Sequence, residues 1–241
     1  MSHEPGAGRE AVGLRGPLGP RPRSYDEALL AAAPAGARGF ERTAYLAETE
    51  LGDLGAGSGF GGRPYLPGGT EHPRCPGCGE AMPLLVQLDT ASMPAGIASG
   101  EGLLQVFYCG ATDDLSPCPA GLEDWEAFSP VHVQRLVPAL SDGRVSVAGE
   151  ALVPRRVTRW LPVPDLPGWE ELTALGVDAG EPPDDVWELP YDGEKLGGWP
   201  RWVQGIEYPS CRVCGRTMAP SSRSIPSGPC PSRSATWASL I

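Results

Sequence analysis

The sequence is poor in several features that would otherwise point to a function. Only three of its 241 residues are histidine, and 19 Lys and Arg residues stand against 30 Asp and Glu residues, so the net charge is −11 with histidine neutral. This acidic balance excludes nucleic acid as the main partner, because a phosphate backbone requires basic charge. The three histidines, at positions 3, 72 and 132, are too few and too scattered to suggest a histidine-based catalytic site.

Long apolar segments are also missing. The stretch Ala28–Ala33 ends at Pro34 and is far shorter than the roughly 20 residues that cross a membrane. The N-terminal residues do not show the basic, then apolar, then small-residue order of a secretory signal. We therefore expect a soluble, cytoplasmic protein with no membrane partner.

Glycine and proline are abundant instead. The 33 Gly and 28 Pro residues make up about a quarter of the chain, which excludes a bundle of long helices and predicts short elements joined by turns. The hydrophobic fraction of 41% is ordinary, and the length allows one large domain or two small ones. Residues 1–23 combine Pro and Gly clusters with no aromatic residue, and we predict a disordered arm there.

Short apolar runs between turn residues predict a sheet. The expected strands are 42–50, Leu84–Leu88, Leu103–Tyr108, Val131–Leu140 and Ala151–Val163. The capping-box spacing of Ser24 and Glu27 predicts a short helix up to Pro34, and a second short helix is expected over Gly168–Leu175. The glycine-rich segment Leu51–Gly62 is predicted to be a loop, and it has no Gly-Lys-Ser/Thr ending that would bind phosphate.

Two segments of the chain resemble each other at an offset of 136 residues. Residues 61–82 and 197–218 agree without a gap at ten of 22 positions, including a Gly-Gly pair, a Cys-x-x-Cys-Gly knuckle and the final Met. We therefore predict two related halves. The expected domain covers 24–218, with repeat one over about 40–140 and a truncated repeat two over about 141–218.

The two repeats diverge after their final Met. Met82 leads into a predicted strand, whereas residues 219–241 are rich in Ser, Arg and Pro and show no strand or helix pattern. With permitted codons, a shifted reading frame turns Ser221–Ile225 into Val-Phe-Gln-Ile-Asp-Ser, whose Gln lies five residues after Met218, as Gln87 lies five after Met82. We predict a disordered, out-of-frame tail; the alternative is an authentic disordered tail.

The seven cysteines stand at positions 75, 78, 109, 118, 211, 214 and 230. A Cys-x-x-Cys-Gly knuckle suits zinc because its tight turn directs two thiolates at one tetrahedral centre. The four ligands are either Cys75, Cys78, Cys109 and Cys118 within repeat one, which the repeat favours, or Cys75, Cys78, Cys211 and Cys214 shared between the repeats. In the first arrangement Cys211 and Cys214 form a second, incomplete site. Disulfides, free thiols and redox chemistry are the alternatives to zinc.

No catalytic residue is predicted, because no nucleophile elbow or phosphate loop is present. The tryptophans at 160, 169, 187, 199 and 202 gather toward the second half, where they either pack in the core or line a groove. Ten acidic residues and no basic residue lie between Asp165 and Glu194, and we expect a solvated, loop-rich face.

Five motifs occur in an order that resembles the YwqG-like family of bacterial proteins of unknown function. They are Phe60-Gly-Gly-Arg-Pro-Tyr-Leu-Pro-Gly-Gly, Cys75-Pro-Gly-Cys-Gly, Leu85-Val-Gln-Leu-Asp89, Gly102-Leu-Leu-Gln-Val-Phe-Tyr-Cys109 and Lys195-Leu-Gly-Gly-Trp-Pro-Arg-Trp-Val-Gln204. The resemblance covers about residues 40–218. It implies a duplicated, sheet-rich α+β fold and no established enzymatic activity.

Together these observations predict an α+β, sheet-rich and internally duplicated fold with short helices and zinc-ribbon-like Cys knuckles. The expected function is that of a zinc-stabilised scaffold that binds an unknown protein partner. The alternative is an enzyme or small-ligand-binding protein that uses a groove between the two repeats, lined by Trp199, Trp202 and the acidic residues 165–194. A pocket lined by converging polar groups would favour the alternative, and an apolar interface would favour the scaffold.

Overall fold

The structure is a computed structural model that describes residues 30–97, 100–109, 112–113, 116–118, 132–138, 142–149, 151–180, 190, 194–202, 205–208, 210, 215 and 217. The predicted arm 1–23, the capping box at Ser24 and the predicted tail 219–241 lie outside these residues. The Cys residues at 211, 214 and 230 also lie outside them.

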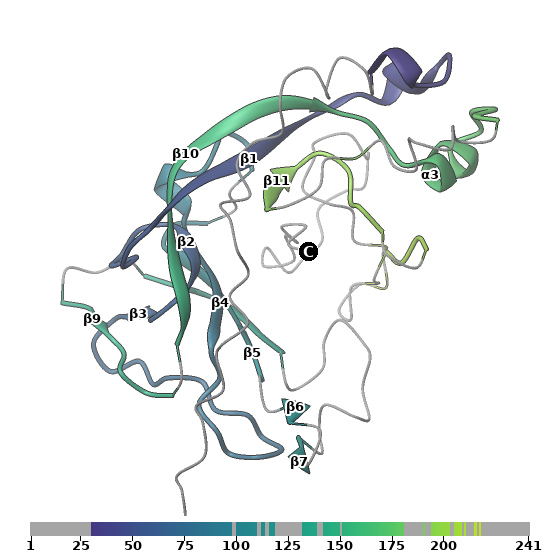
Figure 1. Ribbon diagram of the computed structural model, residues 1–241. Helices are drawn as coiled ribbons and strands as arrows, with labels where there is room; N and C mark the ends of the chain where they lie inside the picture. The colour runs from purple at the N-terminus through teal and green to yellow at the C-terminus, as the bar shows by residue number, and fades with distance from the viewer. Residues whose placement is uncertain are drawn as a thin grey trace, which may run out of the picture.

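The described residues build a seven-stranded sheet of order β11-β1-β10-β2-β4-β5-β8, in which every pairing is antiparallel. The strands are β1 Arg42–Leu51, β2 Gly59–Gly62, β4 Leu84–Asp89, β5 Leu103–Tyr108, β8 His132–Val137, β10 Leu152–Asp165 and β11 Lys195–Gly197. Figure 1 shows the long strands β1 and β10 arching side by side, so the sheet is strongly curled.

Smaller elements surround this sheet. Strands β3 Tyr65–Leu66 and β9 Arg144–Val145 form one two-stranded sheet, and β6 Thr112–Asp113 and β7 Ser116–Pro117 form another. The helical elements are η1 Ala37–Phe40, η2 Thr90–Ser92 and α3 Trp169–Ala174. Sheet therefore dominates the described fold and the helices are short, as the sequence predicts.

The predicted strands and helices agree with this fold where it is described. All five expected strands are present, as β1, β4, β5, β8 and β10, and the second expected helix is α3. Gly176, at a φ of 80°, follows this helix as the predicted stop. Residues 30–32 are helical and end two residues before Pro34.

The loop predicted over Leu51–Gly62 is wrong for its last four residues, which form β2. The reason is that β2 lies too close to β10 for ordinary side chains. A Cβ at Gly59 would lie 2.5 Å from the Arg155 carbonyl oxygen, and one at Gly61 would lie 2.6 Å from the Val153 oxygen. The glycines that suggest flexibility are instead required by the close approach of two strands.

The core is divided between the two faces and one end of the sheet. One cluster gathers Phe60, Val86, Leu88, Val106 and Leu196, and partly buried Tyr45 and Trp160 pack against it. A second cluster contains three of the cysteines with Leu54, Met82, Leu84 and Phe107. A third joins Ala37, Leu166 and Leu172 and fixes α3 to the end of β10.

The acidic segment 165–194 is not uniformly solvated, contrary to expectation. Asp165 is 1% exposed and Glu171 is 3% exposed. The Asp165 carboxylate accepts a hydrogen bond from the Lys195 ammonium at 2.9 Å, and the Tyr208 hydroxyl donates to Glu171. The local density of acidic residues does not reveal that these two carboxylates are buried, because their partners lie more than 20 residues away in the sequence.

Equivalent positions of the two similar segments share backbone features. The φ angles are 64° and 70° at Gly61 and Gly197, and 76° and 67° at Gly79 and Gly215. An isolated antiparallel bridge joins Arg74 to Ala81, and its counterpart, at an offset of 136 residues, joins Ser210 to Thr217. The two Gly-Gly pairs lie at the ends of β2 and β11.

Candidate metal centre

The first Cys-x-x-Cys knuckle is a compact turn between β3 and β4. Its ends are joined by the Arg74–Ala81 bridge, and the Cys75 amide donates to the Glu80 carbonyl at 2.9 Å. The Gly79 amide donates to the Cys75 carbonyl at 2.8 Å, and Gly79 has a φ of 76°, a conformation that favours glycine. This backbone pattern brings both thiols of the knuckle to the same side.

The sheet supplies the other two cysteines. The chain leaves the knuckle directly into β4, whose Leu84 pairs with Phe107 of β5. Cys109 follows the last residue of β5, and Cys118 follows the last residue of β7. The β4–β5 ladder therefore places the end of β5 beside the knuckle, and the β6–β7 hairpin returns the chain to the same point.

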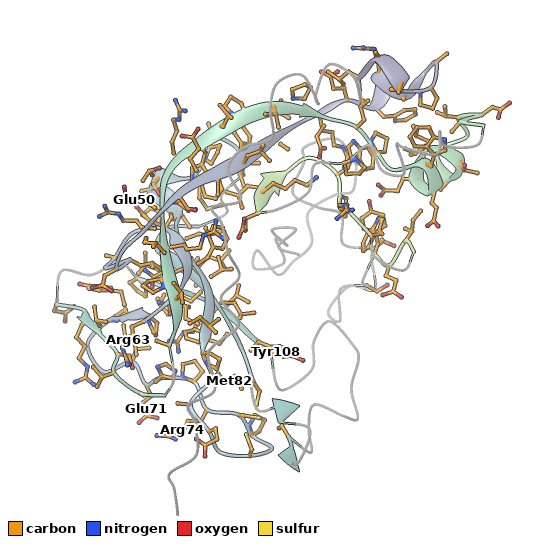
Figure 2. All side chains as sticks on the ribbon, in the orientation of Figure 1. Glu50, Arg63, Glu71, Arg74, Met82 and Tyr108 are labelled. Carbon is orange, nitrogen blue, oxygen red and sulfur yellow. The ribbon has the colours of Figure 1, made fainter. Side chains whose placement is uncertain are left out.

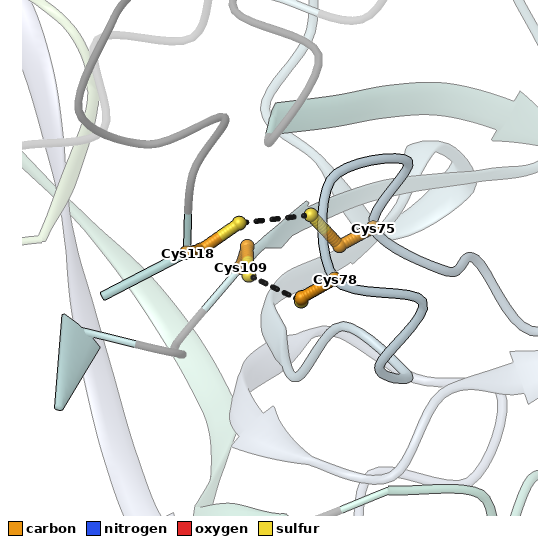
Figure 3. Close-up of side chains that lie close together, drawn as sticks. All are labelled: Cys75, Cys78, Cys109 and Cys118. Atoms are coloured by element: carbon orange, nitrogen blue, oxygen red, sulfur yellow. Dashed lines mark hydrogen bonds between the residues drawn. The ribbon is translucent and has the colours of Figure 1, made fainter. Parts of the chain in front are cut away.

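The four sulfurs meet in one cluster, which Figure 3 shows with two sulfur–sulfur hydrogen bonds dashed. All four Sγ atoms, of Cys75, Cys78, Cys109 and Cys118, lie within 4.8 Å of one another. Cys75 Sγ is 3.5 Å from Cys118 Sγ, and Cys78 Sγ is 3.7 Å from Cys109 Sγ. Four sulfurs around a tetrahedral zinc ion at the usual Zn–S distance are about 3.8 Å apart, so the cluster has the size of a zinc site.

The surroundings of the cluster are apolar. Cys75, Cys109 and Cys118 are at most 5% exposed, and Cys78 is partly buried beside them. Burial raises the pKa of the Cys75 thiol, but hydrogen bonds from the Cys78 and Gly77 amides and from neighbouring thiols outweigh burial and lower this pKa to about 7. Backbone amides directed at the sulfur thus stabilise the thiolate, which is the form that binds metal.

The alternatives to a metal fit this geometry less well. The four cysteines are free, and the closest sulfur pair is far longer than a disulfide bond of about 2.05 Å. Neither Cys75 nor Cys78 begins a helix, so the setting of a redox-active Cys-x-x-Cys is missing in this described part of the chain. The shared site with Cys211 and Cys214 cannot be placed, because both residues lie outside the described ranges.

The histidines do not join the sulfur cluster as far as they are described. His72 Nε2 donates to the Met82 carbonyl at 2.7 Å, Nδ1 lies 2.9 Å from Ser146 Oγ, and the ring packs edge-on against Phe107. Burial lowers the pKa of His72. It is thus a hydrogen-bonded packing residue, as its repeat counterpart Tyr208 suggests. His132 lies in β8 opposite Tyr108, and His3 is outside the described residues.

A buried polar network next to the cluster is not anticipated from the sequence. Gln87 and Gln105 are fully buried neighbours on β4 and β5, and Gln105 Nε2 donates to Gln87 Oε1 at 2.8 Å. Arg135 on β8 extends the network by donating from Nε to Gln105 Oε1 at 3.1 Å. The sequence signal that could have revealed this network is a glutamine in the middle of each of two apolar strands.

A concave surface on the other side of the sheet has a volume of about 580 Å³. Its lining includes Tyr45, Met93, Val157 and Trp160, and does not include Trp199, Trp202 or the acidic residues 165–194. Trp199 is 5% exposed, donates from Nε1 to the Phe40 carbonyl and packs under the Arg42 guanidinium. Trp199 therefore has a packing role. It does not line a groove between the repeats, as the alternative function expects.

Comparison with known protein families gives one match. Residues 58–136 match a domain of unknown function (DUF1963). No curated protein matches the chain. In the described ranges, no helix is both long and apolar enough to cross a membrane. The matched domain begins one residue before β2 and includes Cys75, Cys78, Cys109 and Cys118, so the sulfur cluster lies entirely within DUF1963.

Proposed function

We propose that the protein is a cytoplasmic scaffold for a protein partner and that a structural zinc ion stabilises it. The observation that carries the zinc assignment is the convergence of four cysteine sulfurs within 4.8 Å from two separate parts of the chain. A closed set of four thiolates leaves no coordination position for water or substrate, which is typical of structural rather than catalytic zinc.

The role of the ion would be to fasten the knuckle to the sheet. Cys75 and Cys78 belong to a turn that makes few backbone contacts with β5, whereas Cys109 and Cys118 extend from β5 and β7. A metal bound to all four closes loops of about 30–40 residues, and such a cross-link disfavours the unfolded chain most when the loop is long.

We also propose that the fold is duplicated, with β1 and β10 as its central pair. Phe60 of β2 pairs with Arg155 of β10, and its counterpart Leu196 of β11 pairs with Tyr45 of β1. One residue along, Gly59 pairs with Arg156 and its counterpart Lys195 pairs with Leu46. Each of the two corresponding strands therefore pairs antiparallel with one strand of the β1–β10 pair, and this shared placement supports the proposed duplication.

The scaffold role rests on exposed apolar side chains at one end of the central strands. Leu51 at the end of β1 is 78% exposed, and Leu152 and Val153 at the start of β10 are 44% and 70% exposed. Gly52 donates from its amide to the Pro154 carbonyl, which keeps the two strand ends together. Neighbouring exposed apolar residues of this kind favour contact with another protein.

Metal analysis of the purified full chain tests the zinc assignment. We expect about one zinc per chain and an X-ray absorption signal of four sulfur ligands near 2.3 Å. Cys109→Ser should lower the zinc content and the thermal stability, whereas the matched control Cys230→Ser, which alters a cysteine that is not one of the four proposed ligands, should change neither. If zinc added to the metal-free wild-type protein left its thermal stability unchanged, this result would contradict the assignment.

Site-specific photo-crosslinking in the producing cells tests the scaffold role. A photoreactive residue at Val153 should form a discrete adduct with one protein. The same residue at Leu175, which is 42% exposed at the end of α3, should not. Equal adducts at both positions, or none at either, would argue against a partner on this surface.

A further inference from the structure

Three arginines lie near His72 on the side of the sheet that carries the knuckle. Arg135 donates from Nη1 to the carbonyl of Glu71, the residue before His72, at 3.1 Å. Arg63 precedes Pro64, whose carbonyl accepts from the amide of Ser146, and the Ser146 hydroxyl lies 2.9 Å from the His72 ring. The charges of Arg135, Arg74 and Arg63 all act on the His72 imidazole and, with its burial as the largest cause, lower its pKa. Arg63 follows β2, Arg74 precedes the knuckle and Arg135 lies on β8, so the fold gathers them from distant parts of the sequence. Figure 2 labels Arg63 and Arg74 in the region around β3 and the knuckle.

Two of these guanidinium groups hold buried N–H donors that have no acceptor. Arg135 donates from Nε to Gln105 and from Nη1 to the Glu71 carbonyl, but its Nη2 is buried without a hydrogen-bond partner. Arg63 Nη1 is also buried and has no partner. Nearly all buried polar atoms in proteins are hydrogen-bonded, so two neighbouring charged exceptions require an explanation.

Among the described residues, no carboxylate forms an ion pair with these arginines. The ion pairs between described residues involve Arg155, Arg156, Arg159 and Lys195, and none of these pairs involves Arg63, Arg74 or Arg135. Arg135 instead lies over the Phe107 ring at 4.9 Å, and its burial lowers its pKa. Leaving two half-buried guanidinium groups without a counter-charge is costly, and a chain of net charge −11 has acidic residues in excess to supply one.

The imidazole at the centre does not share in this positive charge. His72 Nε2 must be the protonated nitrogen because it faces the Met82 carbonyl, and Nδ1 accepts from the Ser146 hydroxyl. Both ring nitrogens are therefore occupied, and burial, with the charges of the three arginines, lowers the pKa of the ring and favours its neutral form. The attraction of the site for an anion comes from the guanidinium groups alone.

We infer that Arg63 and Arg135, with Arg74 at the exposed rim, form a binding site for a small oxoanion of the phosphate type. The planar fork of N–H donors in a guanidinium group matches the oxygens of phosphate, and a partly desolvated pair of such forks selects a doubly charged tetrahedral anion over chloride. Arg63 and Arg135 provide the buried donors, and the exposed Arg74 leaves the path to solvent open. No cysteine of the sulfur cluster belongs to this site.

Calorimetric titration of the full chain with inorganic phosphate tests this inference, at constant ionic strength and with chloride as the balancing ion. We expect saturable binding and a rise in the melting temperature with phosphate. Arg63→Gln should weaken phosphate binding about 10- to 100-fold, the effect of losing a hydrogen bond to a charged group. Because Arg63 makes no hydrogen bond in the described structure, this variant should melt no lower than the wild type in phosphate-free buffer.

The matched control is Arg38→Gln, which removes an exposed arginine whose hydrogen bond goes to the Leu30 carbonyl. It should bind phosphate like the wild type. Acetate and sulfate titrations separate a carboxylate site from a tetrahedral-oxoanion site, and tighter binding of acetate than of phosphate would overturn the ligand class. Absence of saturable phosphate binding, or an equal loss in the Arg38 and Arg63 variants, would overturn the site.

Discussion

The ammonium of Lys195 lies 2.9 Å from Asp165 Oδ2, and both side chains are almost fully buried. The same carboxylate oxygen accepts a hydrogen bond from the Trp199 amide at 2.7 Å. Because Asp165 ends β10 and Lys195 begins β11, this ion pair ties the last described strand to the central pair of the sheet. The carboxylate and the ammonium thus form an internal clamp between two residues that are 30 positions apart in the sequence.

Removing one partner of this clamp should destabilise the protein strongly. Asp165→Asn removes the carboxylate that lies 2.9 Å from the buried Lys195 ammonium, and we expect a loss of about 3–5 kcal/mol in the free energy of unfolding. Chemical denaturation checks this value. Glu48→Gln, which breaks the exposed pair with Arg159, is the matched control and should have little effect. Comparable losses in the two variants would show that burial does not set the strength of the pair.

Metal removal should loosen the knuckle before it affects the central strands. Chelation of zinc would leave four thiols that no longer hold the turn to β5, whereas β1 and β10 keep their ten-residue ladder. Hydrogen exchange should therefore accelerate first at the Cys75 and Gly79 amides, and the amides of β1 should stay protected. Uniform acceleration over both regions would instead mean that the ion supports the whole sheet.

Glycine at position 59 should be indispensable for packing. Gly59→Ala places a methyl group against the Arg155 carbonyl and the Leu54 side chain, so β2 must move away from β10. We expect a cost of about 1–3 kcal/mol, typical of overpacking. Gly39→Ala is the control, because a Cβ there meets nothing within 4 Å and should alter stability by no more than about 0.5 kcal/mol. Thermal melts of both variants provide the comparison.

Glu171 should give the protein a characteristic dependence of stability on pH. Burial raises its pKa above the ordinary value of 4.5 in the folded state, although the hydrogen bond from Tyr208 opposes this rise. The folded state then binds more protons than the unfolded state as pH rises above 4.5, so this contribution to stability is present at low pH and is lost toward the raised pKa. The difference in unfolding free energy between wild type and Glu171→Gln, followed from pH 4 to 8 with zinc present, should become less favourable to the wild type. A difference that stays constant over this range would show that Glu171 is not perturbed.

Elements that bury a continuous apolar run could be predicted from the sequence. Leu84–Leu88 and Leu103–Tyr108 bury one or both faces, so their composition alone identifies them as strands. The strand Gly59–Gly62 could not be recognised, because its stability comes from close contact with β10 rather than from its own side chains. The two-residue strands are too short for any periodicity to appear.

The sulfur cluster was easier to anticipate than the polar sites. Cysteine is rare and its Cys-x-x-Cys spacing carries the ligand geometry, so the grouping of Cys75, Cys78, Cys109 and Cys118 follows from the knuckle and the repeat. Arginines have no such local signature. Arg63 follows β2 and Arg135 lies on β8, and these strands are joined into one sheet through β4 and β5, so their relation resides in the strand order.

The pairing of β1 with β10 has a consequence for synthesis of the chain. Thr49 and Arg155 are hydrogen-bonded neighbours, yet 106 residues separate them in the sequence. At about 5–20 residues per second, a ribosome needs roughly 5–20 s to make the intervening segment. During that interval β1 waits without either neighbour, and protease digestion of chains stalled before residue 152 should cleave it readily. The strand that the finished sheet holds between β10 and β11 is thus the first of the described strands to be made and among the last to be paired, so both of its edges are open to other chains during synthesis.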